Sequence, residues 1–201
     1  NAHPAVLRSI VDAGFDLECV SPGEIDHARS ACPDARLLFT PNLARRDDYL
    51  RVADSSALLT IERLDSFAEL GDALPGREVS LRIDLGTGHG HHDKVRTGGA
   101  KSKFGIGVDQ LGEAQRLALQ HGLRIVVLHA HLGSGILDAA HFGRVYQELL
   151  ALAEQVPSVR ALNIGGGFGI AAHPDDSALD LARVGELLAT IKQAHPQYEL
   201  W

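Results

Sequence analysis

The sequence contains no methionine, only two cysteines (Cys19 and Cys32), and no apolar run close to the ~18 residues that a membrane span needs. Two cysteines argue against a disulfide scaffold, so the expected compartment is a reducing cytoplasm. The chain has no charged-then-apolar segment typical of a secretion signal, and we expect no membrane partner. Because a chain without methionine does not begin at a start codon, we expect these 201 residues to be a piece of a longer protein.

Basic residues are also scarce, with 19 Lys and Arg against 26 Asp and Glu and a net charge of −7. No segment gathers Lys and Arg on one face, so we expect no nucleic-acid partner. Glycine is abundant: 21 residues without a tripeptide period predict tight turns in an enzyme-like fold and exclude collagen. No linker-like segment divides the chain, and we expect one domain over residues 1–201.

Short apolar, β-branched runs alternate with segments of helical period, which is typical of βα units around a parallel sheet. The expected strands cover residues 17–20, 36–40, 57–61, 79–84, 125–131, 160–164 and 198–201. The clearest expected helices cover residues 5–13, 109–121, 138–155 and 178–194. Seven strands in a chain of this length predict an α/β, TIM-like (β/α)8 barrel that lacks its first strand. An open doubly wound sheet is the alternative.

Two glutamates lie around the end of the first expected strand. Ser21, Pro22 and Glu24 predict a helix start, in which Ser21 is the N-cap and the Glu24 carboxylate reaches back to the N–H of the cap. This capping role explains Glu24 without a ligand. Glu18 interrupts the strand, and its carboxylate could pair with Arg82 or face a cationic group at the mouth of the barrel.

Glycines 165–167 directly follow the apolar strand expected at residues 160–164. Consecutive glycines allow turns that point several N–H groups into one concavity, and such a nest binds a phosphate. A tight βα turn without a ligand is the alternative. The glycine patterns of dinucleotide-binding and P-loop sites are absent from this segment, so the expected ligand is a phosphate of another kind.

His129, His131 and Ser134 lie at the end of another expected strand. Strand alternation places the two histidines on the same side of the sheet. A histidine there can lie flat on an aromatic cofactor, polarise a carbonyl or bind a metal, and Ser134 could hold a phosphate oxygen. A hydrogen-bonded core histidine is the alternative for either one.

Three further features allow a chemical or a structural interpretation. Arg82 interrupts an apolar strand and needs a carboxylate or a ligand as partner. The segment 88–93 contains three histidines and an aspartate, but adjacent histidines in an irregular loop seldom share one ion, so no metal is expected. Lys103 could neutralise an anion, although most loop lysines are only solvated.

In this order, the motifs resemble those of the fold-type III pyridoxal-phosphate (PLP) decarboxylases, which share their barrel with alanine racemase. The resemblance rests on residues 1–4, 18–25, 81–83, 102–106, 129–134 and 163–169. Within that family the chain is most similar to the diaminopimelate decarboxylase branch, and its sequence at residues 18–21 resembles more closely that of the form fused to aspartate kinase.

The resemblance implies a role for each candidate residue. His131 stacks on the pyridine ring, Ser134 and glycines 165–167 hold the phosphate, and Arg82 lies under the ring. Glu18 and Glu24 lie near the cofactor's lysine as further catalytic residues, although most of the family has aspartate at the position of Glu18. The implied enzyme is a cytoplasmic homodimer that converts meso-diaminopimelate, a small-molecule amino acid, to L-lysine and carbon dioxide.

Several parts of the family's pattern are missing from this sequence. The Schiff-base lysine of a Tyr-x-x-Lys-Ala-Asn motif, a Glu-Pro-Gly-Arg motif on the last barrel strand and a C-terminal β domain have no counterpart in it. We therefore expect a barrel domain incomplete at both ends and an isolated chain without decarboxylase activity. The alternatives are an arginine or ornithine decarboxylase, a non-catalytic barrel homologue, and a metal-dependent hydrolase that uses His129, His131 and residues 89–93.

Overall fold

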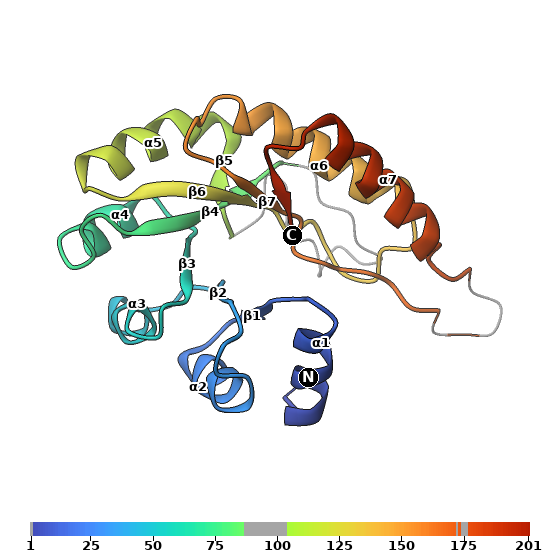
Figure 1. The fold of residues 1–201 in the computed structure, drawn as a ribbon. Helices are drawn as coiled ribbons and strands as arrows, with labels where there is room; N and C mark the ends of the chain where they lie inside the picture. Colours follow the sequence, from blue (N-terminus) through green and yellow to red (C-terminus); the bar gives the residue numbers. More distant parts are fainter. Residues whose placement is uncertain (1, 87–103, 172, 174–176) are drawn as a thin grey trace. The chain divides into compact units, whose positions relative to one another are not determined.

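The computed structural model describes residues 2–86, 104–171, 173 and 177–201 (Figure 1). The chain forms two compact units. The first comprises Asn1–Ser80 and Leu117–Arg124, and the second comprises Leu81–Arg116 and Ile125–Trp201. None of the helices in the described ranges has the length and apolar character that crossing a membrane requires.

The first unit contains three neighbouring parallel strands and four helices that follow the βα pattern. They are α1 (Pro4–Asp12), β1 (Leu17–Cys19), α2 (Pro22–Ala31), β2 (Leu37–Phe39), α3 (Arg46–Ala53), β3 (Leu58–Ile61) and α4 (Asp65–Gly71). Leu17 pairs with Leu37, and Leu38 pairs with Leu58. Because α2 packs on β1 and α3 packs on β3, the apolar face of each helix is buried against a strand.

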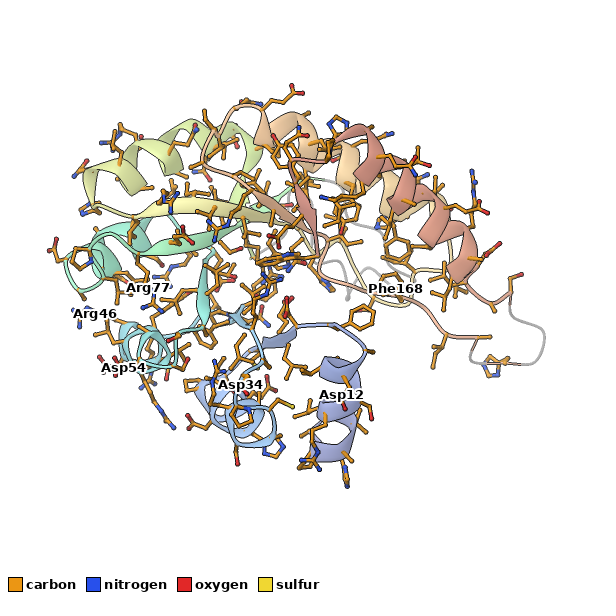
Figure 2. The ribbon with its side chains drawn as sticks, viewed as in Figure 1. Asp12, Asp34, Arg46, Asp54, Arg77 and Phe168 are labelled. Atoms are coloured by element: carbon orange, nitrogen blue, oxygen red, sulfur yellow. The ribbon has the colours of Figure 1, made fainter. Side chains whose placement is uncertain are left out.

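The core of the first unit joins the strands to their helices. The rings of Phe39 and Tyr49 meet edge to face, with centroids 5.5 Å apart, and the Tyr49 hydroxyl donates to the carbonyl of Thr60. Arg77, labelled in Figure 2, donates to the carbonyl oxygens of Ala53 and Ala57 at 2.9 and 3.1 Å. The guanidinium group thereby ties the end of α3 to the start of β3.

The second unit has the strand order β4-β6-β7-β8, with β5 beside β4. The strands are β4 (Glu78–Asp84), β5 (Ile106–Gly107), β6 (Arg124–His129), β7 (Ala161–Asn163) and β8 (Glu199–Leu200). The helices are η2 (Val108–Gln110), α5 (Leu111–Gln120), α6 (Ala139–Ala153) and α7 (Leu181–Ala194). The pairs β4–β5, β6–β7 and β7–β8 are parallel. Chain segments of β4, α5 and β6 belong to both units.

Helices α6 and α7 lie side by side in this unit (Figure 1). The inner face of α6 buries Phe142, Tyr146 and Leu149 completely. The Tyr146 hydroxyl donates to the carbonyl of Trp201 at 2.5 Å, and burial raises the pKa of this phenol. One aromatic side chain thus joins α6 to the residue that follows β8.

The chain is therefore a parallel α/β structure, as the alternation of apolar runs predicts. All seven expected strands and the four expected helices are present, with ends that coincide or differ by at most three residues. Two expectations are wrong in detail. Strand β6 ends at His129, so residues 130 and 131 are not part of it, and β5 was not expected because two residues carry no period.

Candidate functional site

Strands β6 and β7 bring the histidine motif and the glycine motif together at their carboxyl ends. His129 is in register with Asn163, and the N–H of Ala130 donates to the Asn163 carbonyl at 2.9 Å. Parallel neighbours end at the same edge of a sheet, where ligands of parallel α/β proteins bind. This edge therefore positions both motifs within the second unit.

Three successive left-handed residues follow β7. Gly165, Gly166 and Gly167 have φ values of +69°, +82° and +82°, a conformation that a side chain would strain. The N–H of Gly165 donates to the side-chain oxygen of Asn163 at 2.7 Å, which closes the first turn. Asn163 has no role in the sequence-based interpretation, although asparagine two residues before a glycine is a recognisable turn signal.

His131 and His129 both approach Gly165. A Cβ on this glycine would lie 2.7 Å from His131 Nδ1 and 2.9 Å from His129 Nε2. His131 Nδ1 is 2.8 Å from the Gly165 carbonyl oxygen. Because a carbonyl can only accept, Nδ1 carries the proton, and this bond fixes the tautomer of His131. The two histidines meet at Gly165 although only His129 belongs to the strand, so strand alternation does not account for their approach.

The loops after β6 and β7 are joined a second time beyond His131. The N–H of Ile136 donates to the Gly167 carbonyl at 2.9 Å, and the N–H of Gly169 donates to the Ile136 carbonyl at 2.8 Å. A Cβ on Gly167 would lie 2.2 Å from the backbone oxygen of Gly133. Ser134 lies exposed between Gly133 and Ile136, so it stands on the loop that faces the glycine turn.

An aromatic side chain borders the same turn. Phe168, labelled in Figure 2, follows the three glycines and is 47% exposed. Its ring stacks on that of Phe142, with centroids 4.6 Å apart and planes at 19°. The glycine turn is therefore held to α6 by an aromatic pair as well as to the loop after β6 by hydrogen bonds.

Arg82 occupies the centre of β4 and is 6% exposed. Its guanidinium carbon lies 5.0 Å from the centroid of Phe104, a cation–π contact. Gly105, at φ +89°, leaves only 2.9 Å between a Cβ position and the backbone nitrogen of Asp84, which permits the close approach of this segment to β4. Phe104 has no individual role in the sequence-based interpretation, because nothing local marks it as a partner of Arg82.

His129 is neutral at physiological pH. Burial, then the charge of Arg82 and then that of His131 lower its pKa from 6.5 to about 3. The side chain is 1% exposed, and neither ring nitrogen has a hydrogen-bond partner in the described part of the chain. An unpartnered buried polar group costs about 1–3 kcal/mol of stability.

Glu18 and Glu24 belong to the first unit, on either side of Cys19. The Glu24 carboxylate accepts from the N–H of Val20 at 2.7 Å, and the Ser21 side chain accepts from the N–H of Glu24 at 3.2 Å. The helix start is thus confirmed, but the carboxylate bonds to the residue before the cap rather than to the cap itself. Burial, followed by the charges of Glu24 and Glu18, raises the pKa of the Cys19 thiol to about 11.

Some predicted residues lie outside the described part of the chain. They are Asn1, the segment 88–93 and Lys103. Among the residues that the structure describes, no three or more His, Cys, Asp or Glu side chains are grouped to hold a metal ion.

Comparison with known proteins identifies the family. The family described as "Pyridoxal-dependent decarboxylase, pyridoxal binding domain" matches residues 1–200. The chain belongs to this family. It is 34% identical over 188 residues to a diaminopimelate decarboxylase of Methanothermobacter thermautotrophicus, a match that covers 90% of this chain and 44% of that protein. It is also 34% identical over 193 residues to the Streptomyces coelicolor enzyme of that name, covering 93% of this chain and 43% of that protein.

Solved structures of diaminopimelate decarboxylases have the same fold. A crystal structure of diaminopimelate decarboxylase superimposes with a TM-score of 0.83 at 29% identity, covering 99% of this chain and 50% of that one. The Helicobacter pylori enzyme complexed with L-lysine gives a TM-score of 0.87 at 21% identity, covering 100% and 53%. The chain spans about half the length of the relatives it matches, and corresponds to their pyridoxal-binding barrel.

The residues of the second unit fit the pyridoxal group that gives the family its name. Three successive left-handed glycines form a turn whose backbone is free of side chains, as phosphate binding through backbone N–H groups requires, and a Cβ at Gly165 or Gly167 would collide with the histidines or with the backbone of Gly133. A histidine with a fixed tautomer and a buried arginine lie in the same unit. The described residues can therefore hold a phosphate and a flat aromatic ring.

Proposed function

We propose that this chain is the cofactor-binding barrel of a PLP-dependent decarboxylase that converts meso-diaminopimelate to L-lysine and carbon dioxide. The observation that carries the proposal is the joining of His131 to the first of three left-handed glycines at the ends of β6 and β7. The names of the relatives support the substrate, as does the L-lysine in the Helicobacter pylori structure.

The proposed roles divide among the residues of the second unit. Glycines 165–167 and Ser134 bind the phosphate, and the His131 imidazole stacks on the ring, held by the Gly165 carbonyl. Arg82 lies under the ring and supplies a buried positive charge. When bound, PLP provides an electron sink for the carbanion that decarboxylation leaves. The protein's part is to fix the orientation of the ring and to exclude water from it.

Glu18 and Glu24 are proposed to lie near the lysine that carries the cofactor. Glu24 already accepts a backbone hydrogen bond, which fixes the position of its carboxylate. A fixed carboxylate can hold or move a proton at a neighbouring amine, whereas a mobile one cannot do so with defined geometry. In the whole protein we propose a cytoplasmic homodimer.

The proposal is tested on the whole protein that carries this chain, supplied with PLP. Carbon dioxide release from meso-diaminopimelate is expected to exceed release from L-arginine or L-ornithine at least tenfold in kcat/KM, and His131→Ala is expected to lower kcat/KM at least tenfold. Preference for arginine or ornithine would overturn the substrate. A properly folded protein that releases carbon dioxide from none of them would overturn the reaction. The isolated 201-residue chain is expected to be inactive.

A further inference from the structure

His129 is a buried polar side chain to which the proposed function assigns no role. Within the described ranges, its two nitrogens and the hydroxyl oxygen of Ser80 are the buried side-chain polar atoms without a hydrogen-bond partner. Most buried polar atoms in proteins have a partner, because an unpaired one destabilises the fold. An apolar side chain of similar volume would therefore give a protein at least as stable, so the position of His129 has to be explained by the packing of its ring and not by its nitrogens.

The contacts of His129 indicate that explanation. Its Nε2 and the Nδ1 of His131 come within 2.9 and 2.7 Å of the same point, the place where a Cβ of Gly165 would stand. Gly165 also accepts the hydrogen bond from His131 through its carbonyl oxygen. Both rings thus fill the space that this glycine leaves open. Removing the His129 ring would open a void beside Gly165, and a close-packed site relaxes into such a void.

The electrostatic surroundings agree with a supporting role rather than with acid–base chemistry. Arg82 and His131 both disfavour a proton on His129, and burial disfavours it further, so the ring stays uncharged across the physiological range. Both nitrogens are buried without a hydrogen-bond partner among the described residues, an arrangement that gives no support for a role in proton transfer. A neutral ring can pack against His131 without adding positive charge next to Arg82.

We propose that His129 is a positioning residue for His131: its ring packs against Gly165 and keeps the His131 imidazole in the orientation and the Nδ1–H tautomer that bind the cofactor's ring. The proposal rests on the proposed function, since His131 is the residue that meets the ring. It predicts that the packing volume of residue 129 matters and that its nitrogens do not.

Two substitutions at this position separate volume from hydrogen bonding. His129→Leu keeps most of the volume and removes the unpartnered nitrogens, whereas His129→Ala leaves a void. The probe is pyridoxine 5'-phosphate, which has the ring and the phosphate but no aldehyde, so covalent attachment to a lysine does not contribute. Affinity is measured by titration calorimetry on the whole protein. The His131 tautomer is measured by ¹⁵N NMR with selectively labelled histidine, in the same protein without ligand.

The expected results differ between the variants. His129→Leu should unfold at the same temperature as the wild type or higher, and should bind the probe within threefold of wild-type affinity. His129→Ala should bind it at least tenfold more weakly, and its His131 should lose the single Nδ1–H signal. Leu149→Ala is the control for general destabilisation, because Leu149 is fully buried on α6 in the same unit; it should lower the melting temperature and leave affinity and tautomer unchanged.

Three outcomes would overturn the proposal. If His129→Ala is destabilised but keeps the affinity and the His131 tautomer, the residue only fills the core. If His129→Leu loses as much affinity as His129→Ala, the nitrogens and not the volume are needed. If Leu149→Ala shifts the tautomer as well, the effect is not local. Failure of the wild-type protein to bind the probe would instead contradict the proposed function, while the NMR measurement without ligand still decides the role of His129.

Discussion

The two compact units hold their candidate residues in different ways. In the second unit, His131 and Gly165 are 34 positions apart in the sequence and bond through a side chain and a backbone carbonyl. In the first unit, the Glu24 carboxylate bonds to Val20, only four positions away, and the geometry of a helix start accounts for the bond. A contact between two strand ends has no local explanation, whereas a capping contact has a complete one.

The difference determines how strongly each unit supports a function. A buried histidine whose nitrogens have no hydrogen-bond partner among the described residues is a costly feature that folding alone does not require, and it meets the turn of three left-handed glycines in the second unit. Costly local features that cluster at strand ends indicate a ligand site. In the first unit the carboxylate of Glu24 has an ordinary structural role, so the part of Glu24 in catalysis must be tested by a substitution that leaves the capping bond intact.

The largest expected effect concerns the glycine turn of the second unit. Gly167→Ala places a Cβ 2.2 Å from the backbone oxygen of Gly133, which cannot move aside as a side chain would. Backbone strain and overpacking together should lower the free energy of unfolding by about 3–4 kcal/mol. Gly166→Ala is the matched control, because it has the same φ of +82° and nothing within 4 Å of its Cβ; it should lose only about 1–2 kcal/mol. Urea unfolding measures both, and equal losses would contradict the steric argument.

The second effect is the acid sensitivity that His129 gives to this unit. With a pKa of about 3 in the folded protein and 6.5 when exposed, the unfolded chain binds a proton between these values that the folded chain does not. The free energy of unfolding therefore falls as pH decreases through this window, by about 2 kcal/mol between pH 7 and pH 5. The measurement is urea unfolding at both pH values for the wild type and His129→Leu, which should lack this part of the loss. Parallel pH profiles would refute the depressed pKa.

The sequence predicts the elements of both units well and their contacts poorly. Apolar periodicity locates the strands because a buried parallel strand must be apolar. Ser21, Pro22 and Glu24 correctly mark the start of α2, and the one difference is that the Glu24 carboxylate accepts from the N–H of Val20 instead of from the N–H of Ser21. The contact between Phe104 and Arg82 and the meeting of two histidines at Gly165 depend on strand pairing. Pairing joins residues that no local pattern relates, so the pattern could place both motifs at strand ends but not predict which of their residues touch.

The nitrogens of His129, which lack hydrogen-bond partners among the described residues, are a second feature that the sequence could not predict. A histidine at the end of an apolar strand predicts either a ligand contact or a hydrogen-bonded core residue, and in the described part of the chain neither ring nitrogen of His129 has a hydrogen-bond partner. Hydrogen-bond satisfaction is a property of the packed environment, in which one missing neighbour changes the result. No sequence pattern carries that information.

The third prediction tests whether the first unit contributes more than a cap. Glu24→Gln keeps an oxygen that can accept from the N–H of Val20, so the free energy of unfolding should change by less than about 0.5 kcal/mol, whereas Glu24→Ala should lose about 1 kcal/mol. If the carboxylate serves the cofactor's lysine, Glu24→Gln should still lower kcat for decarboxylation at least tenfold in the whole protein. Full activity in Glu24→Gln would mean that Glu24 has only a structural role. The proposed chemistry would then lose the support of Glu24 and rest mainly on the residues of the second unit.

The smallest expected effect concerns the contact between Phe104 and Arg82, a non-local contact of the second unit that involves β4 instead of β6 and β7. Phe104→Leu keeps an apolar side chain near Arg82 but removes the face of the aromatic ring, on which the guanidinium group lies at 5.0 Å. The lost cation–π attraction should be about 0.5–1 kcal/mol. A double-mutant cycle with Arg82→Met, followed by urea unfolding, isolates this coupling from the packing losses of the two single substitutions. A coupling indistinguishable from zero would mean that Arg82 is held in β4 by its other neighbours, and that Phe104 only covers the strand.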